Sequence, residues 1–435
     1  MLNPLDDQLY QNLVTATLER IKPDSFTAVR DIRVAIEEGM RGRAFQSVDL
    51  SMGHPGQDAP EEVTNSAAEH MLRMKRKGYD EFSGISRIKV ASADVLNRNF
   101  GTDAKPENIY VEPGAMAMNH MNWTRLVYEH MHGLDPMLLL FEPVYAEVPD
   151  QLDDLGFDLN ELVVPVDLRK YRGSRLDNIE DLIISARSTS PERPLHIHWS
   201  SASNPCSTSF NGDEYRKIAA VANKHGVNIL EDGAYLGMDY DAGDWKDGNV
   251  IENSARYGDH VVLSLGLSKL LGLAGERIAV SFVSDAIKKR YSELRKMYSG
   301  KDVEDFRSRH RHQFTHAGLA IQHAVADYLS DPQLNPRMRA YIKRYRDRYA
   351  GAEQELQKNG FEYVITNPDG TVARIFYMPV RGSFEKFLRS QMFTMPLSIF
   401  STRRETSIDG VRLAIPGIMD DRNYELFSER LPYAA

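Results

Sequence analysis

The stretch Ser264-Leu-Gly-Leu-Ser-Lys269-Leu-Leu-Gly-Leu-Ala-Gly-Glu-Arg277 decides how this 435-residue sequence is interpreted. It follows directly on Val261-Val262-Leu263, an apolar run that predicts a buried strand. Burial and nearby cations help a lysine amine to lose its proton, which Schiff-base chemistry at Lys269 would require. An arginine fork such as Arg277, together with backbone or hydroxyl donors, suits a phosphate group. Taken alone, the stretch fits a surface lysine in a glycine-rich turn about equally well.

A second group of polar residues lies upstream, at Asn204-Pro205-Cys206-Ser207 and around Asp232. Asp232 ends a predicted strand, where a carboxylate can pair with the protonated ring nitrogen of a ligand. Asn204 and Tyr235 can each hydrogen-bond a phenolate oxygen on the same ring. The alternatives are a helix cap for Asp232 and simple packing for Tyr235.

Short apolar strands alternate with helices from about residue 60 to residue 284. This pattern predicts an α/β fold with a mainly parallel sheet covered by helices on both faces. Ligands of such sheets lie beyond the carboxyl ends of the strands, where both polar groups fall. The predicted strands are at 109–111, 138–141, 195–198, 228–230, 261–263 and 278–282.

The two ends of the chain show a different pattern. Helices are expected at 5–22 and 26–38, followed by a short strand at 47–50. Beyond residue 284 the pattern predicts a smaller α+β domain. Its expected elements are helices within 309–329 and 336–358, a hairpin that turns at 367–370, and strands at 395–400 and 410–415.

Bulk composition limits the class of protein. The net charge of −9 argues against a general nucleic-acid binder, which would need a basic face. Cys206 is the only cysteine, so an intrachain disulfide is impossible. The N-terminus lacks the basic and apolar regions of a secretory signal, and the apolar runs are too short to span a bilayer. We therefore expect a cytoplasmic protein with no membrane or nucleic-acid partner.

These motifs together resemble the fold type I enzymes that use pyridoxal 5′-phosphate (PLP), in the class I/II aminotransferase family related to aspartate aminotransferase. The pattern Ser-Lys-x-x-Gly-Leu-x-Gly-x-Arg stands at 268–277. Asn-Pro precedes Asp232 by 28 positions (232 − 204), and Asp-x-x-Tyr follows. The resemblance implies a large domain with a seven-stranded sheet and a smaller α+β domain. The implied limits are 1–58 for the N-terminal arm, which is part of the small domain, 59–310 for the large domain and 311–435 for the small domain.

The resemblance also implies a role for each matching residue. Lys269 would carry PLP as a Schiff base, and Asp232 would pair with its ring nitrogen. Substrate would lie against Gly53, with its carboxylate held by Arg412. Tyr235 and Asn204 would contact the phenolate oxygen of the cofactor, and Tyr145 would stack on its ring. The implied phosphate contacts are Arg277, Ser268, Gly114, Ala115, Met116 and Tyr79. Of these, Tyr79 would act in the partner subunit's site.

Each of these assignments has a structural alternative. Tyr79 and Tyr145 could be packing aromatics, Gly53 a simple turn residue, and Arg412 a surface ion-pair partner. The sequence also departs from the family pattern at three places. The family usually has a serine or threonine three positions before the lysine, where this chain has Gly266. The usual Asn-Pro-Thr-Gly run is Asn-Pro-Cys-Ser at 204–207. The usual glycine two positions after the arginine is Ala279.

The implied activity is transamination between an L-amino acid and a 2-oxo acid, through the Lys269 Schiff base and a 1,3-proton transfer. A homodimer with shared active sites is implied as well. Elimination, replacement or oxidation at an amino acid remains an alternative, and a non-catalytic PLP-binding regulator is a third. No Cys/His set has zinc-site spacing, so no metal is expected. His54, Glu147, Trp199 and the run 310–312 are candidates for lining the pocket, although such side chains are more often structural or exposed.

Overall fold

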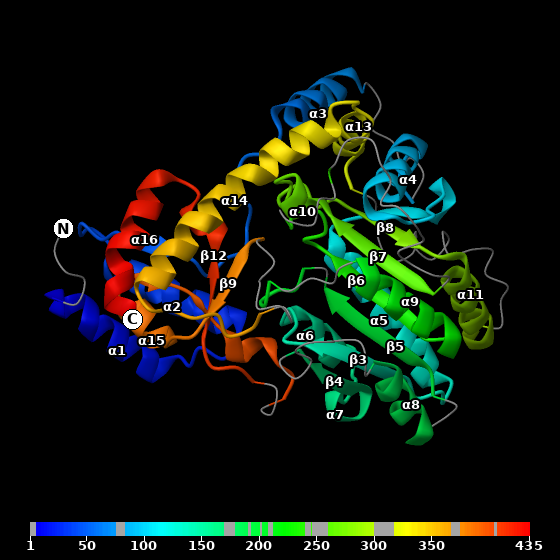
Figure 1. Ribbon diagram of the computed structural model, residues 1–435, viewed down its shortest axis with the longest axis horizontal. Coiled ribbons are helices and arrows are strands. Elements are labelled where there is room, and N and C mark those ends of the chain that lie inside the picture. Colours follow the sequence, from blue (N-terminus) through cyan, green and yellow to red (C-terminus); the bar gives the residue numbers. More distant parts are fainter. Residues whose placement is uncertain are drawn as a thin grey trace.

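A computed structural model describes most of the chain, and its main feature is one large sheet with a smaller group of elements beside it (Figure 1). The smaller group contains the first and the last described helices, α1 and α16 (Figure 1). The described residues are 6–74, 83–168, 179–189, 193–200, 202–207, 212–239, 245, 260–299, 317–366, 375–403 and 407–435.

The large sheet has seven strands in the order β2-β8-β7-β6-β5-β3-β4. Only β8 runs antiparallel to its two neighbours, so the expectation of a mainly parallel sheet is confirmed. The strands are β2 (Ile109–Glu112), β3 (Met137–Glu142), β4 (Val163–Asp167), β5 (Leu195–Ser200), β6 (Asn228–Gly233), β7 (Val261–Gly266) and β8 (Ala279–Val283).

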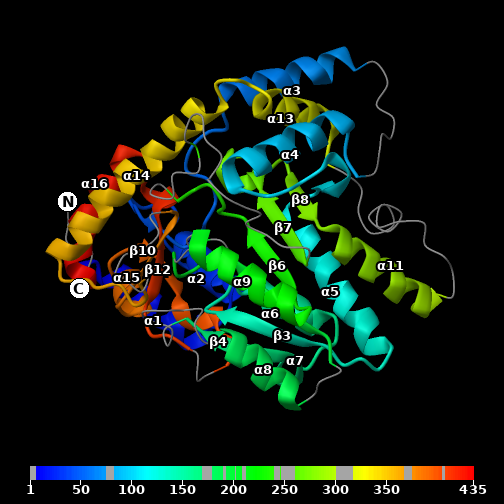
Figure 2. The same ribbon diagram turned by 45° about the vertical axis from the view of Figure 1, so that its right-hand side comes forward.

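Both faces of this sheet are buried, because alternate residues of each strand enter different apolar clusters. In β6, for example, Ile229 packs into one cluster and Leu230 into the other. Two helices, α5 (Ala115–Met131) and α11 (Asp285–Ser299), cover the face that holds Leu230. The opposite face is covered by α4 (Ser86–Phe100), α8 (Ile179–Thr189), α9 (Gly212–His225) and α13 (Leu319–Leu329). Figure 2 shows α5 and α9 on the two sides of the strands.

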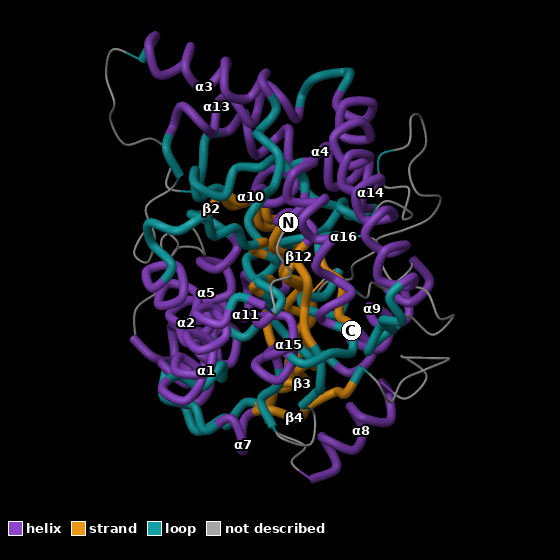
Figure 3. The backbone as a smooth tube through the Cα atoms, turned by 90° about the vertical axis from the view of Figure 1, so that its left-hand side faces the viewer, coloured by secondary structure: helices purple, strands orange, loops and turns teal. Residues whose placement is uncertain are grey.

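The smaller group is built on a three-stranded antiparallel sheet, β11-β12-β9, and a parallel pair, β1-β10. A backbone bond from Ala414 N–H to the Leu50 carbonyl (2.9 Å) joins these two sheets, so residues far apart in sequence meet here. Figure 3 shows these strands flanked by helices. The strands are β1 (Val48–Asp49), β9 (Tyr377–Val380), β10 (Met392–Phe393), β11 (Met395–Pro396) and β12 (Val411–Ala414).

The helix α14 (Leu334–Lys358) runs from the neighbourhood of α13 down to the smaller sheet, as both Figure 1 and Figure 2 show. It therefore connects the two parts of the molecule. The other helices are α1 (Gln8–Arg20), α2 (Phe26–Gly39), α3 (Glu61–Arg73), α6 (Glu147–Asp154), α7 (Leu159–Leu162), α10 (Leu267–Leu270), α15 (Phe384–Arg389) and α16 (Asp421–Ala434), with short 3₁₀ turns η2 (Pro106–Asn108), η3 (Leu397–Phe400) and η5 (Ile415–Ile418).

Most predicted elements are confirmed, with two differences. The edge strand β4 was not predicted, because Pro165 interrupts its apolar pattern; an edge strand tolerates proline since one side needs no ladder bond. The strand expected at 395–400 is wrong in length, because it ends at Pro396 and continues as a 3₁₀ turn. The hairpin turn at 367–370 lies outside the described residues, and the domain limits at 58 and 310 stay predictions. Among described helices, none combines the length and apolar character needed to cross a membrane.

Candidate active site

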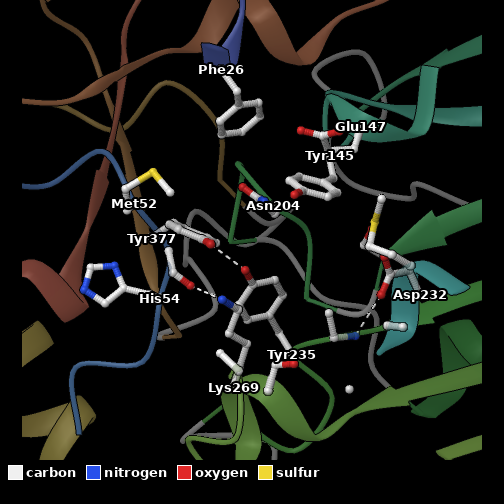
Figure 4. Close-up of a pocket in the computed structure, with 18 of the residues that line it drawn as sticks. Phe26, Met52, His54, Tyr145, Glu147, Asn204, Asp232, Tyr235, Lys269 and Tyr377 are labelled. Carbon is white, nitrogen blue, oxygen red and sulfur yellow. Dashed lines mark hydrogen bonds between the residues drawn. The ribbon is translucent and has the colours of Figure 1, made fainter. Parts of the chain in front are cut away.

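A cavity of about 440 Å³ lies at the carboxyl ends of the large sheet, where the smaller sheet faces it. Parts of the chain far apart in sequence form its walls. Lys269 comes from α10, Asp232 from the end of β6, Arg412 from β12 and Phe26 from α2. Eleven of the thirteen residues predicted for the site line this cavity: Gly53, Ala115, Met116, Tyr145, Asn204, Asp232, Tyr235, Ser268, Lys269, Arg277 and Arg412. Figure 4 labels five of them, Tyr145, Asn204, Asp232, Tyr235 and Lys269.

Lys269 stands on the short helix α10, which begins directly after β7 ends at Gly266. Its Nζ donates a hydrogen bond to the Gly53 carbonyl. The pKa of Lys269 is lowered to about 8, first by burial and then by the positive charges of Arg412 and Arg277. The uncharged fraction of this amine near neutral pH is therefore far larger than that of an ordinary lysine, and the uncharged form is the one that attacks a carbonyl carbon.

Asp232 is a buried carboxylate with neutral partners. One oxygen accepts from the Ala234 N–H (2.9 Å) and the other from the Asn119 amide (3.2 Å). Burial raises the pKa of Asp232, and these two hydrogen bonds lower it only in part. A cationic group in the cavity would stabilise the ionised form. Asn119 is a residue that the sequence interpretation missed, although it follows Ala115 by four positions and so shares its helix face.

An anion site is formed where β2 leads into α5. Gly114, with φ of 91°, precedes the first residue of this 17-residue helix, whose N-terminal N–H groups attract anions. Arg277 lies against this turn, because a Cβ atom on Gly114 would come within 2.6 Å of its Nη2. Glycine at 114 thus permits both the turn and the close approach of the guanidinium group. Arg277 itself has φ of 50° and donates to the Ala274 carbonyl (3.1 Å).

Arg412 is 1% exposed, and its described partners carry no negative charge. Its Nη1 donates to the Asn204 side-chain oxygen (2.8 Å) and its Nη2 to the Ser51 carbonyl, while Nε has no partner among described atoms. The guanidinium group lies 4.3 Å from the ring centre of Tyr377 and 5.1 Å from that of Phe400. A buried cation without a counter-charge is costly, so this site favours an anionic ligand. The surface ion-pair alternative for Arg412 does not fit its burial.

Tyr377 is the most prominent lining residue that the sequence interpretation missed. Its hydroxyl is hydrogen-bonded to the Tyr235 hydroxyl, and both side chains are buried (Figure 4). A Cβ atom on Gly53 would overlap the Tyr377 hydroxyl, so Gly53 is needed for this packing. Nothing in the sequence around 376–379 marks Tyr377 as a site residue, because only the pairing of β9 with β12 brings it beside Arg412.

The open end of the cavity carries aromatic and charged side chains. The ring of Phe26 packs edge-on against Tyr145, with ring centres 5.7 Å apart. Glu147 begins α6 beside them, and its pKa is raised by burial and by the negative charges of Asp150 and Asp154. His54 also lines the cavity (Figure 4).

The remaining candidates fall elsewhere. Trp199 packs into the core beside Phe141 and is 2% exposed, so it does not line the cavity. Tyr79 and the run 310–312 lie outside the described residues. Gly266, the first departure from the family pattern, has a structural reason: a Cβ atom there would come within 2.9 Å of the Ala234 Cα. A serine or threonine at 266 would require the backbone to move.

The residues present fit PLP. The Gly114 turn and Arg277 suit its phosphate, Asp232 suits a protonated ring nitrogen, and Lys269 suits its aldehyde. The unpartnered Nε of buried Arg412 offers a further donor for a carboxylate. The cavity volume lies within the usual range for small-molecule sites.

Comparison with known proteins agrees with this arrangement. The sequence profile described as "Aminotransferase class I and II" matches residues 46–415. A "Probable aspartate/prephenate aminotransferase" of Aquifex aeolicus is 25% identical over 45% of this chain and 46% of its own length, so that alignment spans about half of the relative. A "Probable aspartate aminotransferase" of Methanocaldococcus jannaschii is 21% identical over 66% of this chain and 67% of its own length.

Solved structures show the same fold. The aspartate aminotransferase of Thermus thermophilus, solved with maleate, superposes with a TM-score of 0.73 at 18% identity, over 97% of this chain and 99% of that one. An aromatic aminotransferase of Pyrococcus horikoshii gives 0.68 at 18% identity, over 94% and 98%. The expected fold type I architecture is confirmed.

Proposed function

The chain belongs to the class I and II aminotransferase family, and from this premise we propose that it is a PLP-dependent aminotransferase that acts on an L-amino acid and a 2-oxo acid. One observation carries the proposal. A lysine of lowered pKa, a buried carboxylate and a buried arginine without a counter-charge among the described residues all face one cavity. Each lacks the partner that a cofactor or an amino-acid substrate would supply.

The bound cofactor would supply an electron sink that makes the Cα–H bond of an amino acid acidic. Lys269 acts as both base and acid, because its Nζ is largely uncharged above about pH 8 and can accept and return the Cα proton. Asp232 keeps a cationic ring nitrogen in place by charge pairing at the floor of the cavity. Arg277 and the Gly114 turn hold the phosphate, and Tyr145 contributes an aromatic face at the open end.

Arg412 orients the substrate by its α-carboxylate. Two of its nitrogens are fixed by Asn204 and the Ser51 carbonyl, and the ring of Tyr377 lies under the guanidinium plane. The group is therefore held rigidly before substrate arrives, which lowers the entropy cost of binding. Asn204 has a second role here beyond the predicted contact with the cofactor, because its oxygen positions Arg412.

A homodimer with shared active sites, implied by the resemblance, and a cytoplasmic location, expected from the single cysteine and the N-terminal sequence, are further proposals. Elimination, replacement or oxidation is the second candidate reaction. Gly266 and the Asn-Pro-Cys-Ser run at 204–207 support it, because both alter the loops around the cofactor site.

The test uses purified protein reconstituted with PLP and followed by its visible absorbance. We expect a panel of L-amino acids to convert the aldehyde form of the cofactor to the amine form, and a 2-oxo acid to restore it. The product of each half-reaction is identified by mass spectrometry. If amino acids bleach the band but no 2-oxo acid restores it, transamination is wrong. Ammonia with an eliminated or oxidised product would then identify the second candidate.

A further inference from the structure

Two buried tyrosine hydroxyls meet beside Lys269, and only one of them has an expected partner in the cofactor. The Tyr235 hydroxyl is the group that the family resemblance assigns to the phenolate oxygen of PLP. The Tyr377 hydroxyl is hydrogen-bonded to it. The two rings pack edge to face with centres 5.4 Å apart, so this geometry is maintained by packing as well as by the hydrogen bond.

The charged and titratable neighbours of this pair decide the direction of the bond. Arg412 on β12 lies 4.3 Å from the Tyr377 ring centre, Lys269 lies on α10, Asp232 on β6, and Tyr145 at the open end. Burial raises the pKa of Tyr377, and the Arg412 charge acts against that rise. Burial raises the pKa of Tyr235 well above its ordinary value, its contact with Tyr377 raises it further, and the Arg412 charge acts against the rise there as well. The Arg412 guanidinium lies over the Tyr377 ring, and a positive charge beside a phenol makes its hydroxyl a better donor, which favours Tyr377 as the donor and Tyr235 as the acceptor.

A tyrosine hydroxyl has one proton to donate and can accept as well. If Tyr377 donates to Tyr235, the Tyr235 proton is free for a second acceptor. Hydrogen bonds in such a chain strengthen one another in a buried setting. The reverse direction would use the Tyr235 proton inside the protein and leave none for a ligand.

We propose that Tyr377 is a positioning residue that orients the Tyr235 hydroxyl so that its proton is donated to the phenolate oxygen of bound PLP. This inference rests on the proposed function. A stronger donor at the phenolate stabilises its negative charge and so favours loss of the proton shared with the Schiff-base nitrogen. Tyr377 therefore sets the pH at which the visible band of the loaded enzyme changes, by acting through the Tyr235 hydroxyl.

The experiment titrates the visible absorbance of the PLP-loaded enzyme against pH in wild type, Tyr377→Phe, Tyr235→Phe and the double variant. Phenylalanine keeps the ring that packs on Arg412, so folding and PLP retention should persist. We expect Tyr377→Phe to raise the midpoint by roughly half a pH unit, as the loss of part of one hydrogen bond implies. Tyr235→Phe should raise it more, and the double variant should match Tyr235→Phe alone.

The matched control is Tyr363→Phe, which removes a hydroxyl that bonds Tyr349 and Glu353 outside the cavity. Its midpoint should equal that of wild type. The inference is overturned by an unchanged midpoint in Tyr377→Phe, by additive shifts in the double variant, by an equal shift in the control, or by the absence of a midpoint in every protein. Failure of wild type to form the PLP band would instead overturn the proposed function.

Discussion

Two buried groups of charged residues in this protein differ in whether their charges are paired with one another. In the first, between α5 and β5, His196 lies between Arg125 and Glu129, with its ring nitrogens 2.7 Å from each. In the second, the candidate active site, Arg412 and Asp232 are equally buried but have only neutral described partners. The first group therefore compensates its charges internally, whereas the second leaves them for a ligand.

The pKa values follow this difference. Burial acts to raise the pKa of Glu129, but its contact with His196, including their hydrogen bond, and the charge of Arg125 hold it below its ordinary value. Burial raises the pKa of Asp232, and no cation among the described residues opposes it. Since burying an unpaired charge is costly, uncompensated groups gathered around one cavity indicate function, and a compensated group indicates architecture.

The largest effect is expected from Lys269→Ala. This change removes both the covalent attachment and the proton carrier, so we expect transamination to fall at least about 10⁴-fold. The visible Schiff-base band should disappear while the melting temperature stays near that of wild type. A variant that keeps the band would place the attachment at another lysine.

Next is Glu129→Gln, which breaks the compensated group. Removing one charge of a buried set leaves the others unpaired, so we expect a loss of about 3 kcal/mol in the free energy of unfolding. The pKa of Glu129 is depressed in the folded state, so this stabilisation is present above the ordinary pKa of 4.5 and disappears as the pH falls below it.

Urea unfolding at pH 7 and at acid pH measures both effects. The folded variant should retain kcat/KM, because His196 and its partners do not line the cavity. A large loss of activity in the folded fraction would contradict the division between the two groups.

Arg412→Met removes a charge from the uncompensated group. We expect the KM for amino acids to rise about 100-fold, since a charge-assisted bidentate contact is lost. The melting temperature should change far less than in Glu129→Gln, because an unpaired buried cation is replaced by an apolar chain of similar length. Thermal melting without ligand, compared between these two variants, tests the contrast directly. A similar fall in the melting temperature of both variants would contradict the contrast between the two groups.

The pH dependence of PLP capture follows from the Lys269 pKa of about 8. Only the uncharged amine attacks an aldehyde, so the rate of band formation by apoenzyme should rise roughly tenfold per pH unit below this value and level off above it. Stopped-flow absorbance between pH 6 and about 9.5 measures the profile. A rate that continues to rise toward the ordinary lysine pKa would mean that burial does not depress it.

The smallest effect is expected from Glu147→Gln at the open end. Glu147 and its neighbours Asp150 and Asp154 repel anions there. We expect the KM for a 2-oxo acid with a second carboxylate to fall two- to threefold, roughly the size of one half-exposed charge interaction. The KM for pyruvate, which lacks the second carboxylate, is the control. An equal change for both acids would show that Glu147 does not act on side-chain charge.

Much of the cofactor side of the site could be predicted from sequence. Lys269, Asp232 and Arg277 follow strands or turns whose apolar pattern is local, and their spacing along the chain is distinctive. Parallel strands bring their carboxyl ends to one edge, so the motifs had to meet. The edge strand β4 was not predicted, because Pro165 interrupts its apolar pattern. A proline is tolerated there only because the strand lies at the edge of the sheet, and the sequence does not show which strand is at the edge.

The sequence by itself determined the alternation of strands and helices, the lysine in its small-residue loop, and the order of the motifs, because each depends on residues close together in the chain. Only the tertiary structure decided that Phe26 and Tyr377 face Lys269 across one cavity, and that the charge of Arg412 has no described counterpart while that of Glu129 does. The reason is physical. Pairing and compensation of buried charges depend on contacts between residues far apart in the chain, 67 positions for His196 and Glu129 and 208 for Arg412 and Asn204, and local patterns carry no information about them.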